Sequence, residues 1–346
     1  MSASLGDHCA RKIGRGLQAV KAGLVAGSCI RLCAALLLLS TALPSIAQSA
    51  EEGQAVVLVH GFDSGPEIWR GTARILQERG YLALPVLWAP EAGQRAPQVA
   101  TQVLLPRIRE ALSAAGIPPE SGFHVITHSL GGLLLRFLLE HPGEDADEPL
   151  SNGSWRGDGV PDGDPNLRQQ VRSLIMLSTP NQGARTGVAR MACSAYHRKE
   201  WRPLGCDMLL TSPFQTLLGT RKPSEVDTPY LAIGVEAPAP LFFAPPYDGD
   251  GDGQRAGHDN AVMAEAAQLD GAPFVVWRGW RQADHFHSTC SETVNGWFLS
   301  FLDRGAVPEP STARSGRGDA CRGLAKGAWR KAWELRQDAA QSGDRR

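Results

Sequence analysis

One serine in this sequence stands where a nucleophile is expected. In Val125-Ile126-Thr127-His128-Ser129-Leu130-Gly131-Gly132, Ser129 lies between a predicted strand and a predicted helix. A sharp turn there forces the side chain outward, and the helix N-terminus favours negative charge that develops beside it. Gly131 supplies the small neighbour that such a turn needs, whereas Thr127 occupies the place of the first glycine in the common GxSxG pattern. The alternative is a serine that only caps a helix.

A second segment contains backbone amides that such a serine would need. His60-Gly61-Phe62 follows the strand predicted at residues 55–59. In a parallel sheet the carboxyl ends of the strands meet at one edge, so this segment is predicted to lie near Ser129. The amides of Phe62 and Leu130 would then donate to the oxyanion of a tetrahedral intermediate. His60 itself is predicted to shape the loop.

The general base must be a histidine within reach of the serine hydroxyl. His285 and His287 are the candidates, because both follow the last predicted strand. His128, beside the serine, is predicted to be oriented by the turn. An acid must hold the base in its useful tautomer. The candidate acids follow the strand predicted at residues 230–235 and are Asp248, Asp250, Asp252 and Asp259.

Alternating hydrophobic segments predict the elements that position these residues. Strands are predicted at 55–59, 81–88, 122–127, 171–177, 230–235 and 274–277, and helices at 67–79, 98–115, 131–140 and 292–302. Such alternation predicts a parallel sheet flanked by helices. The polar segment 141–170 is predicted to be a surface insertion, and 185–228 an insertion that could cap a pocket.

A third motif adds to the first two. Leu177-Ser178-Thr179-Pro180-Asn181-Gln182-Gly183 is similar to the strand end that lipases write as TPHxG. With these motifs, the chain resembles the α/β-hydrolase superfamily over roughly residues 55–302, and within it the secreted bacterial lipase and esterase branch. The resemblance implies an α/β-hydrolase fold, with a mostly parallel central sheet, helices on both faces and a cap or lid insertion.

The resemblance also implies the order serine, acid, histidine along the chain. His285 precedes the final helix by the gap usual in similar hydrolases, so we assign the base to His285, with His287 as the alternative. The segment 258–269 is similar to the one in which this branch places its acid, so we assign the acid to Asp259. The alternatives remain Asp248, Asp250 and Asp252. The implied activity is hydrolysis of a carboxylic ester without a cofactor.

The identity of the substrate is less sharply predicted. Apolar residues at Leu209, Leu210, Phe214, Leu217 and Leu218, with 241–243, could line an acyl pocket or lid, or could be ordinary core. We favour a lipase-like enzyme acting on an ester or lipid. A small-ester esterase, a thioesterase or an amidase would use the same three residues. A non-catalytic relative that binds a partner would lack one of them.

The acidic loop also matches the spacing of a calcium-binding loop. Asp248, Asp250, Asp252, Gly253 and Asp259 take its first, third, fifth, sixth and twelfth positions. No helical pattern flanks the loop, and the last ligand is Asp instead of Glu. A solvated turn is the preferred interpretation, with no metal at the catalytic residues.

The N-terminal segment is typical of a secretory signal. Basic residues up to Arg31 precede the apolar run 32–39, and small residues at 45–47 suit signal peptidase. We predict cleavage before Gln48 and a secreted or periplasmic protein; an uncleaved anchor is the alternative. The predicted organisation is a signal peptide at 1–47, a catalytic domain at 48–303, and a linker with a basic helix at 304–346.

Four of the seven cysteines follow the predicted signal. An even number in an exported protein favours disulfides over a metal or redox site. Three pairings are open to four cysteines. The simplest by spacing joins Cys193 to Cys206 and Cys290 to Cys321.

Charge excludes one class of partner. With 35 basic and 36 acidic residues, the chain is not typical of proteins held on nucleic acid by phosphate contacts. The tail at 304–346 is basic and could contact an anionic lipid surface transiently, or form a solvated helix. Nothing in the sequence requires an obligate protein partner.

Overall fold

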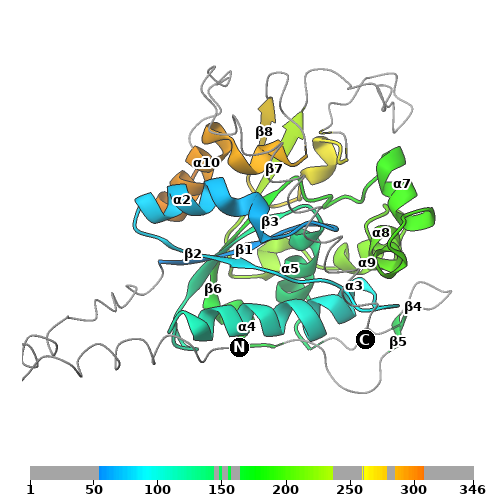
Figure 1. Cartoon of the computed structure of the whole chain (residues 1–346), viewed down its shortest axis with the longest axis horizontal. Coiled ribbons are helices and arrows are strands. Elements are labelled where there is room, and N and C mark those ends of the chain that lie inside the picture. The colour runs from blue at the N-terminus through cyan, green and yellow to red at the C-terminus, as the bar shows by residue number, and fades with distance from the viewer. Residues whose placement is uncertain are drawn as a thin grey trace, which may run out of the picture. The chain divides into compact units, whose positions relative to one another are not determined.

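Six parallel strands form the central sheet (Figure 1). The computed structural model describes residues 54–143, 148–149, 155–156, 164–236, 259, 261–278 and 285–307. The strands are β1 (Ala55–Val59), β2 (Leu82–Val86), β3 (Phe123–His128), β6 (Val171–Leu177), β7 (Tyr230–Glu236) and β8 (Phe274–Arg278). Their spatial order is β2-β1-β3-β6-β7-β8, and all five pairings are parallel. The predicted parallel sheet is confirmed.

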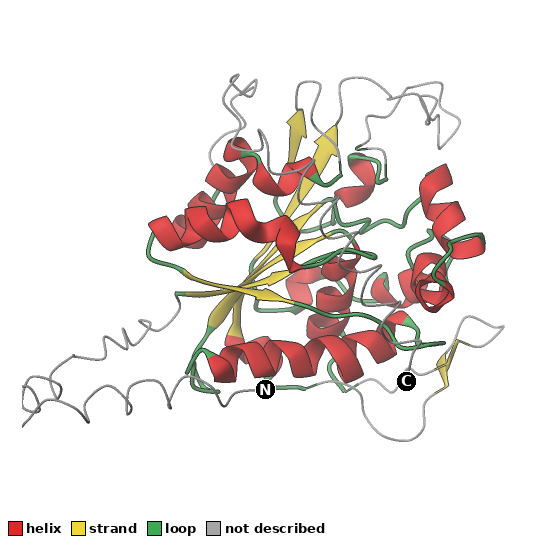
Figure 2. Cartoon of the chain, viewed as in Figure 1, coloured by secondary structure: helices red, strands yellow, loops and turns green. Residues whose placement is uncertain are grey.

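Both faces of the sheet are covered by helices, as Figure 2 shows. Because successive side chains of a strand point to opposite faces, β1 serves two cores. Val57 and Val59 pack in one core with α4 (Leu105–Ala114) and α5 (Leu130–Glu140). Val56 and Leu58 pack in the other. Its helices are α2 (Arg70–Glu78), which follows a 3-10 turn at Pro66–Trp69, and α10 (Glu292–Arg304).

The helix predicted at 98–115 is longer and less regular than its sequence pattern indicates. It begins as α3 (Ala96–Gln98), passes through π-helical turns at Val99–Leu104 and continues as α4. Pro106 has no N–H and therefore cannot donate within the helix. The wider hydrogen bonding lies just before it, where the Leu105 amide donates to the Ala100 carbonyl.

The predicted cap insertion contains three short helices. They are α7 (Gly187–Ser194), α8 (Arg202–Asp207) and α9 (Pro213–Leu218). Phe214 and Leu218 are buried in the core, where Phe214 contacts Phe137, as the interpretation of ordinary core residues expects. Leu210 is 44% exposed. Residues 241–243 lie outside the described residues.

The remaining elements are short. They are α6 (Leu167–Gln170), the hairpin β4 (Glu148–Pro149) and β5 (Trp155–Arg156), and 3-10 turns at Lys199–Trp201, Pro223–Glu225, Glu265–Ala267 and His287–Cys290. In the described part of the chain, no helix is long and apolar enough to cross a membrane. Residues 1–53, which include the predicted signal, and residues 308–346, which make up most of the basic tail, lie outside it.

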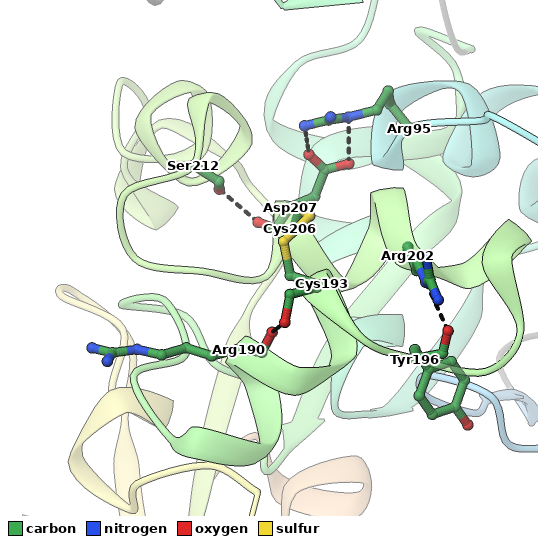
Figure 3. The surroundings of a disulfide bond; sticks show 9 residues. Arg95, Arg190, Cys193, Tyr196, Arg202, Cys206, Asp207 and Ser212 are labelled. Atoms are coloured by element: carbon green, nitrogen blue, oxygen red, sulfur yellow. Dashed lines mark hydrogen bonds and ion pairs between the residues drawn. A yellow bond between two sulfur atoms is a disulfide. The ribbon is translucent and has the colours of Figure 1, made fainter.

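A disulfide joins Cys193 at the end of α7 to Cys206 in α8 (Figure 3). This is the pairing predicted from the spacing of the cysteines. Cys321 lies outside the described residues, so its pairing with Cys290 stays a prediction.

Candidate active site

Ser129 has a backbone conformation that ordinary helix-capping serines do not adopt. It lies between β3 and α5 with φ 53° and ψ −129°. A positive φ in a residue other than glycine is costly and is retained mainly at functional sites. The Ser129 side chain makes no capping hydrogen bond, whereas Ser212 and Ser291 each accept one from the first turn of the following helix. The structure therefore disfavours the simple helix cap.

Close packing around the serine explains the neighbouring glycines. A Cβ atom on Gly131 would lie 2.5 Å from the His60 carbonyl oxygen, and one on Gly61 would lie 2.7 Å from the Cβ of Ser129. Thr127, in place of the first motif glycine, is fully buried and its hydroxyl donates to the Ile175 carbonyl at 3.2 Å. The hydrogen bond to β6 satisfies the hydroxyl group that this larger residue buries.

The His60 side chain orients the loop that carries Phe62. The Trp88 amide donates to His60 Nε2, so the ring proton is on Nδ1, which donates to the Gly61 carbonyl at 3.0 Å. The peptide that links Gly61 to Phe62 is trans, so the Phe62 N–H points opposite to that carbonyl. His60 is also stacked on Trp88, with ring centroids 5.0 Å apart. These contacts are how His60 shapes the loop, as predicted from the sequence.

Asp259 and His285 lie together in the structure. His285 Nδ1 is 2.7 Å from Asp259 Oδ2, and both side chains are buried. The other carboxylate oxygen accepts from the amides of Ala261 and Val262 at 2.9 and 2.7 Å. The His285 amide donates to the Asp259 carbonyl at 2.9 Å. Side chain and backbone therefore hold the imidazole with Nε2 free of the carboxylate.

These contacts keep Asp259 ionised. Burial alone raises the pKa of a carboxyl group, but the charge of His285 and the hydrogen bonds from His285, Val262 and Ala261 outweigh it. The net effect lowers the pKa of Asp259 below its usual value. The alternative acids Asp248, Asp250 and Asp252 lie outside the described residues. His287 begins the 3-10 turn that follows His285.

His128 connects the turn at Ser129 to His285. Its Nε2 donates to the His285 carbonyl at 2.7 Å, and the two rings are 4.4 Å apart. No hydrogen bond links the Ser129 hydroxyl to His285 among the described residues, and such bonds are often looser without substrate. The structure thus brings Asp259, His285 and the Ser129 turn together. Sequence reasoning missed this contact, because nothing in the pattern around His128 indicates its partner.

Comparison with solved structures identifies the architecture. The chain is similar to the Bacillus licheniformis lipase BlEst2 in its propeptide form, at 17% identity and a TM-score of 0.50. The match covers 76% of this chain and 53% of that one. The chain has the α/β-hydrolase fold.

Two other solved lipase structures match with lower TM-scores. The mature form of the same Bacillus lipase matches at 18% identity and a TM-score of 0.49, covering 73% of this chain and 92% of that one. Aspergillus fumigatus lipase B matches at 14% identity and a TM-score of 0.46, covering 75% and 54%. No protein-family model matches the chain, and no curated protein matches it.

Within the described residues, no three His, Cys, Asp or Glu side chains are arranged to hold a metal ion. Asp259, the last position of the calcium-like spacing, has both carboxylate oxygens engaged by His285 and two amides. The other positions of that loop lie outside the described residues.

Acid is expected to destabilise the protein through His128. Burial, followed by the charge of His285, lowers the pKa of His128 to about 3. In the unfolded chain a histidine has a pKa of about 6.5. Between these values only the unfolded state binds the proton, so the stabilisation present above pH 6.5 is lost as the pH falls. The slope from this one group is about 1.4 kcal/mol per pH unit.

Urea unfolding at several pH values between 7 and 4.5 would measure this slope. The control is His128→Gln, because the glutamine amide nitrogen can still donate to the His285 carbonyl. In the variant, the free energy of unfolding should fall less steeply with falling pH, by about 1.4 kcal/mol per pH unit. Equal slopes for the variant and the wild type would show that His128 does not titrate in this way.

Proposed function

We propose that the chain is a serine hydrolase that cleaves carboxylic esters, with a lipase-like preference for apolar acyl groups. The observation that carries the proposal is the buried pair of Asp259 and His285, held beside a strained serine that does not cap its helix. In neutral His285, an Nδ1–H bonded to Asp259 leaves Nε2 as the proton acceptor.

The proposed reaction has two matching halves. Ser129 Oγ attacks the ester carbonyl carbon while its proton passes to His285 Nε2. The C–O bond to the alcohol then breaks, and His285 returns the proton to the leaving alcohol. Water repeats the sequence on the acyl-enzyme, which releases the carboxylic acid and restores Ser129. Asp259 stabilises the imidazolium in both halves.

Two backbone amides are proposed to bind the oxyanion. Leu130 is the first residue of α5, so its amide has no acceptor within the helix. The Phe62 amide is oriented by the His60 contact with the Gly61 carbonyl. A Cβ atom on Gly61 would lie 2.7 Å from the Cβ of Ser129, so this loop lies close to the proposed nucleophile. Amide hydrogen-bond donors that are already in position before the reaction stabilise the negative charge of the oxyanion as it develops.

Two measurements on the disulfide-bonded protein test the proposal. A fluorophosphonate probe should label the native protein on the peptide that contains Ser129, and labelling should be lost on heat denaturation. Hydrolysis of p-nitrophenyl esters from acetate to palmitate should show an optimum at long acyl chains. An optimum at acetate or butyrate would instead indicate a small-ester esterase. A folded protein that is neither labelled nor active on esters, thioesters or amides would contradict a serine hydrolase.

We further propose that the protein is exported. The disulfide between Cys193 and Cys206 supports an oxidising compartment, as does the signal-like segment before Gln48. N-terminal sequencing of the protein recovered outside the cytoplasm should begin at Gln48, whereas an uncleaved anchor would leave the segment attached.

A further inference from the structure

The residue after Phe62 is tied to a distant segment of the chain. Asp63 has φ 38°, in the left-handed region that aspartate tolerates better than most residues. Its carboxylate accepts hydrogen bonds from the Tyr196 hydroxyl and from the Arg198 guanidinium. The Asp63 side chain is only 10% exposed, so solvent screens these contacts weakly. We call Asp63, Tyr196 and Arg198 the clamp.

The same segment also packs against Phe62. The Phe62 ring lies edge-on to Tyr196 and to Trp201, with centroids 5.0 and 5.2 Å apart. Arg198 stands over the Trp201 ring at 5.7 Å and donates to Glu200 at 3.0 Å. The loop residues Phe62 and Asp63 are therefore both held by residues 196–201.

This segment is itself fixed at both ends. The Cys193–Cys206 disulfide closes it, and the Arg202 side chain donates to the Tyr196 carbonyl at 2.7 Å (Figure 3). Next to Cys206, the fully buried Asp207 carboxylate binds Arg95 and accepts from the Ala96 amide at 2.9 Å. The segment that contains residues 196–201 is thus anchored to the body of the protein at the start of α3.

We propose that the clamp positions the Phe62 amide for the oxyanion, and that the Cys193–Cys206 disulfide is needed to hold the clamp in place. The inference rests on the proposed function. An oxyanion donor acts at about 2.7–3.1 Å from the developing charge, and a displacement of about 1 Å can cost roughly a hundredfold in rate. The clamp does not touch the substrate. Its three residues are positioning residues, and they act on kcat rather than on substrate affinity.

Variants of Arg198 test this inference. Arg198→Met removes the ion pair at a side chain that is 36% exposed, so folding should be preserved. We expect kcat for ester hydrolysis to fall about 10- to 100-fold, with KM changed less than about threefold. Inhibition by a trifluoromethyl ketone, whose adduct places an oxyanion in the same hole, should weaken in proportion to kcat. Arg198→Lys should recover part of both losses.

The matched control is Arg221→Met, which breaks an exposed pair with Glu225 at 3.7 Å in the same insertion. It should leave kcat and the inhibitor affinity unchanged. The disulfide is tested by Cys193→Ser with Cys206→Ser, which should lower kcat in the same way. Because both changes act through the position of Phe62, adding Arg198→Met to this variant should cost much less than Arg198→Met alone.

The outcomes separate the two proposals. A wild type that cleaves no acyl substrate would overturn the proposed function and this inference together. An active wild type whose Arg198→Met variant keeps its kcat and inhibitor affinity would overturn the inference alone. So would a loss confined to KM, or full additivity between the disulfide and Arg198 changes.

Discussion

Replacing Ser129 by alanine is expected to lower kcat for p-nitrophenyl butyrate hydrolysis by about a million-fold, with little change in KM. In the proposed mechanism the nucleophile and its base act as a unit, since neither achieves covalent catalysis without the other. His285→Ala should therefore cost about as much as Ser129→Ala, and the double variant should lose no further activity. Steady-state rates at saturating ester, with the uncatalysed rate subtracted, measure all three.

His287→Ala is the control for this series. His287 lies two residues after His285 and was the alternative base, but His285 is the histidine found against Asp259. The control should keep kcat within about threefold, because the Asp259 carboxylate holds His285 and not His287. Loss of activity in His287→Ala, with His285→Ala still active, would assign the base to His287.

The strands and most helices could be predicted because their hydrophobic patterns are local. The run at residues 171–177 matches β6 to the residue, and the one at 55–59 matches β1. The interruption of the helix at 98–115 was not predicted, because apolar spacing does not report a change from α-helical to π-helical hydrogen bonding. A proline within the run was the available signal, and its effect on the preceding turns depends on packing.

The candidate site was only partly accessible from sequence. The Ser129 motif fixes a strand-to-helix turn, but spacing alone could not choose Asp259 over the aspartates at 248–252. The choice depends on backbone amides at 261 and 262 that reach one carboxylate oxygen while His285 reaches the other. This set of hydrogen bonds around the carboxylate exists only in the folded loop, so the sequence pattern does not reveal it.

Contacts between residues far apart in the sequence were inaccessible for a similar reason. His128 and His285 are 157 positions apart, and Asp63 and Arg198 are 135 apart. The sequence around a single histidine or a single aspartate contains no pattern that predicts which distant residue it contacts. The order of the strands in the sheet and the segment closed by the Cys193–Cys206 disulfide bring these residues together, so the contacts follow from the topology.

Asp259→Asn is expected to lower kcat about 10⁴-fold while leaving the fold intact. The asparagine carbonyl can still accept from the amides of Ala261 and Val262, which keeps the loop in place. Its NH₂ group then faces His285 Nδ1 and donates to it. Nδ1 must become the acceptor, so the proton moves to Nε2, and that nitrogen can no longer take the proton of Ser129.

The matched control removes the three alternative acids together, as Asp248→Asn, Asp250→Asn and Asp252→Asn in one chain. Steady-state measurements of kcat for both variants compare the two acid assignments directly. Circular dichroism verifies that both variants fold. If the triple variant lost activity and Asp259→Asn stayed within tenfold of wild type, the acid would lie in the 248–252 loop. The expected order is the reverse, because the described carboxylate already holds the imidazole and is kept ionised by its three hydrogen-bond donors.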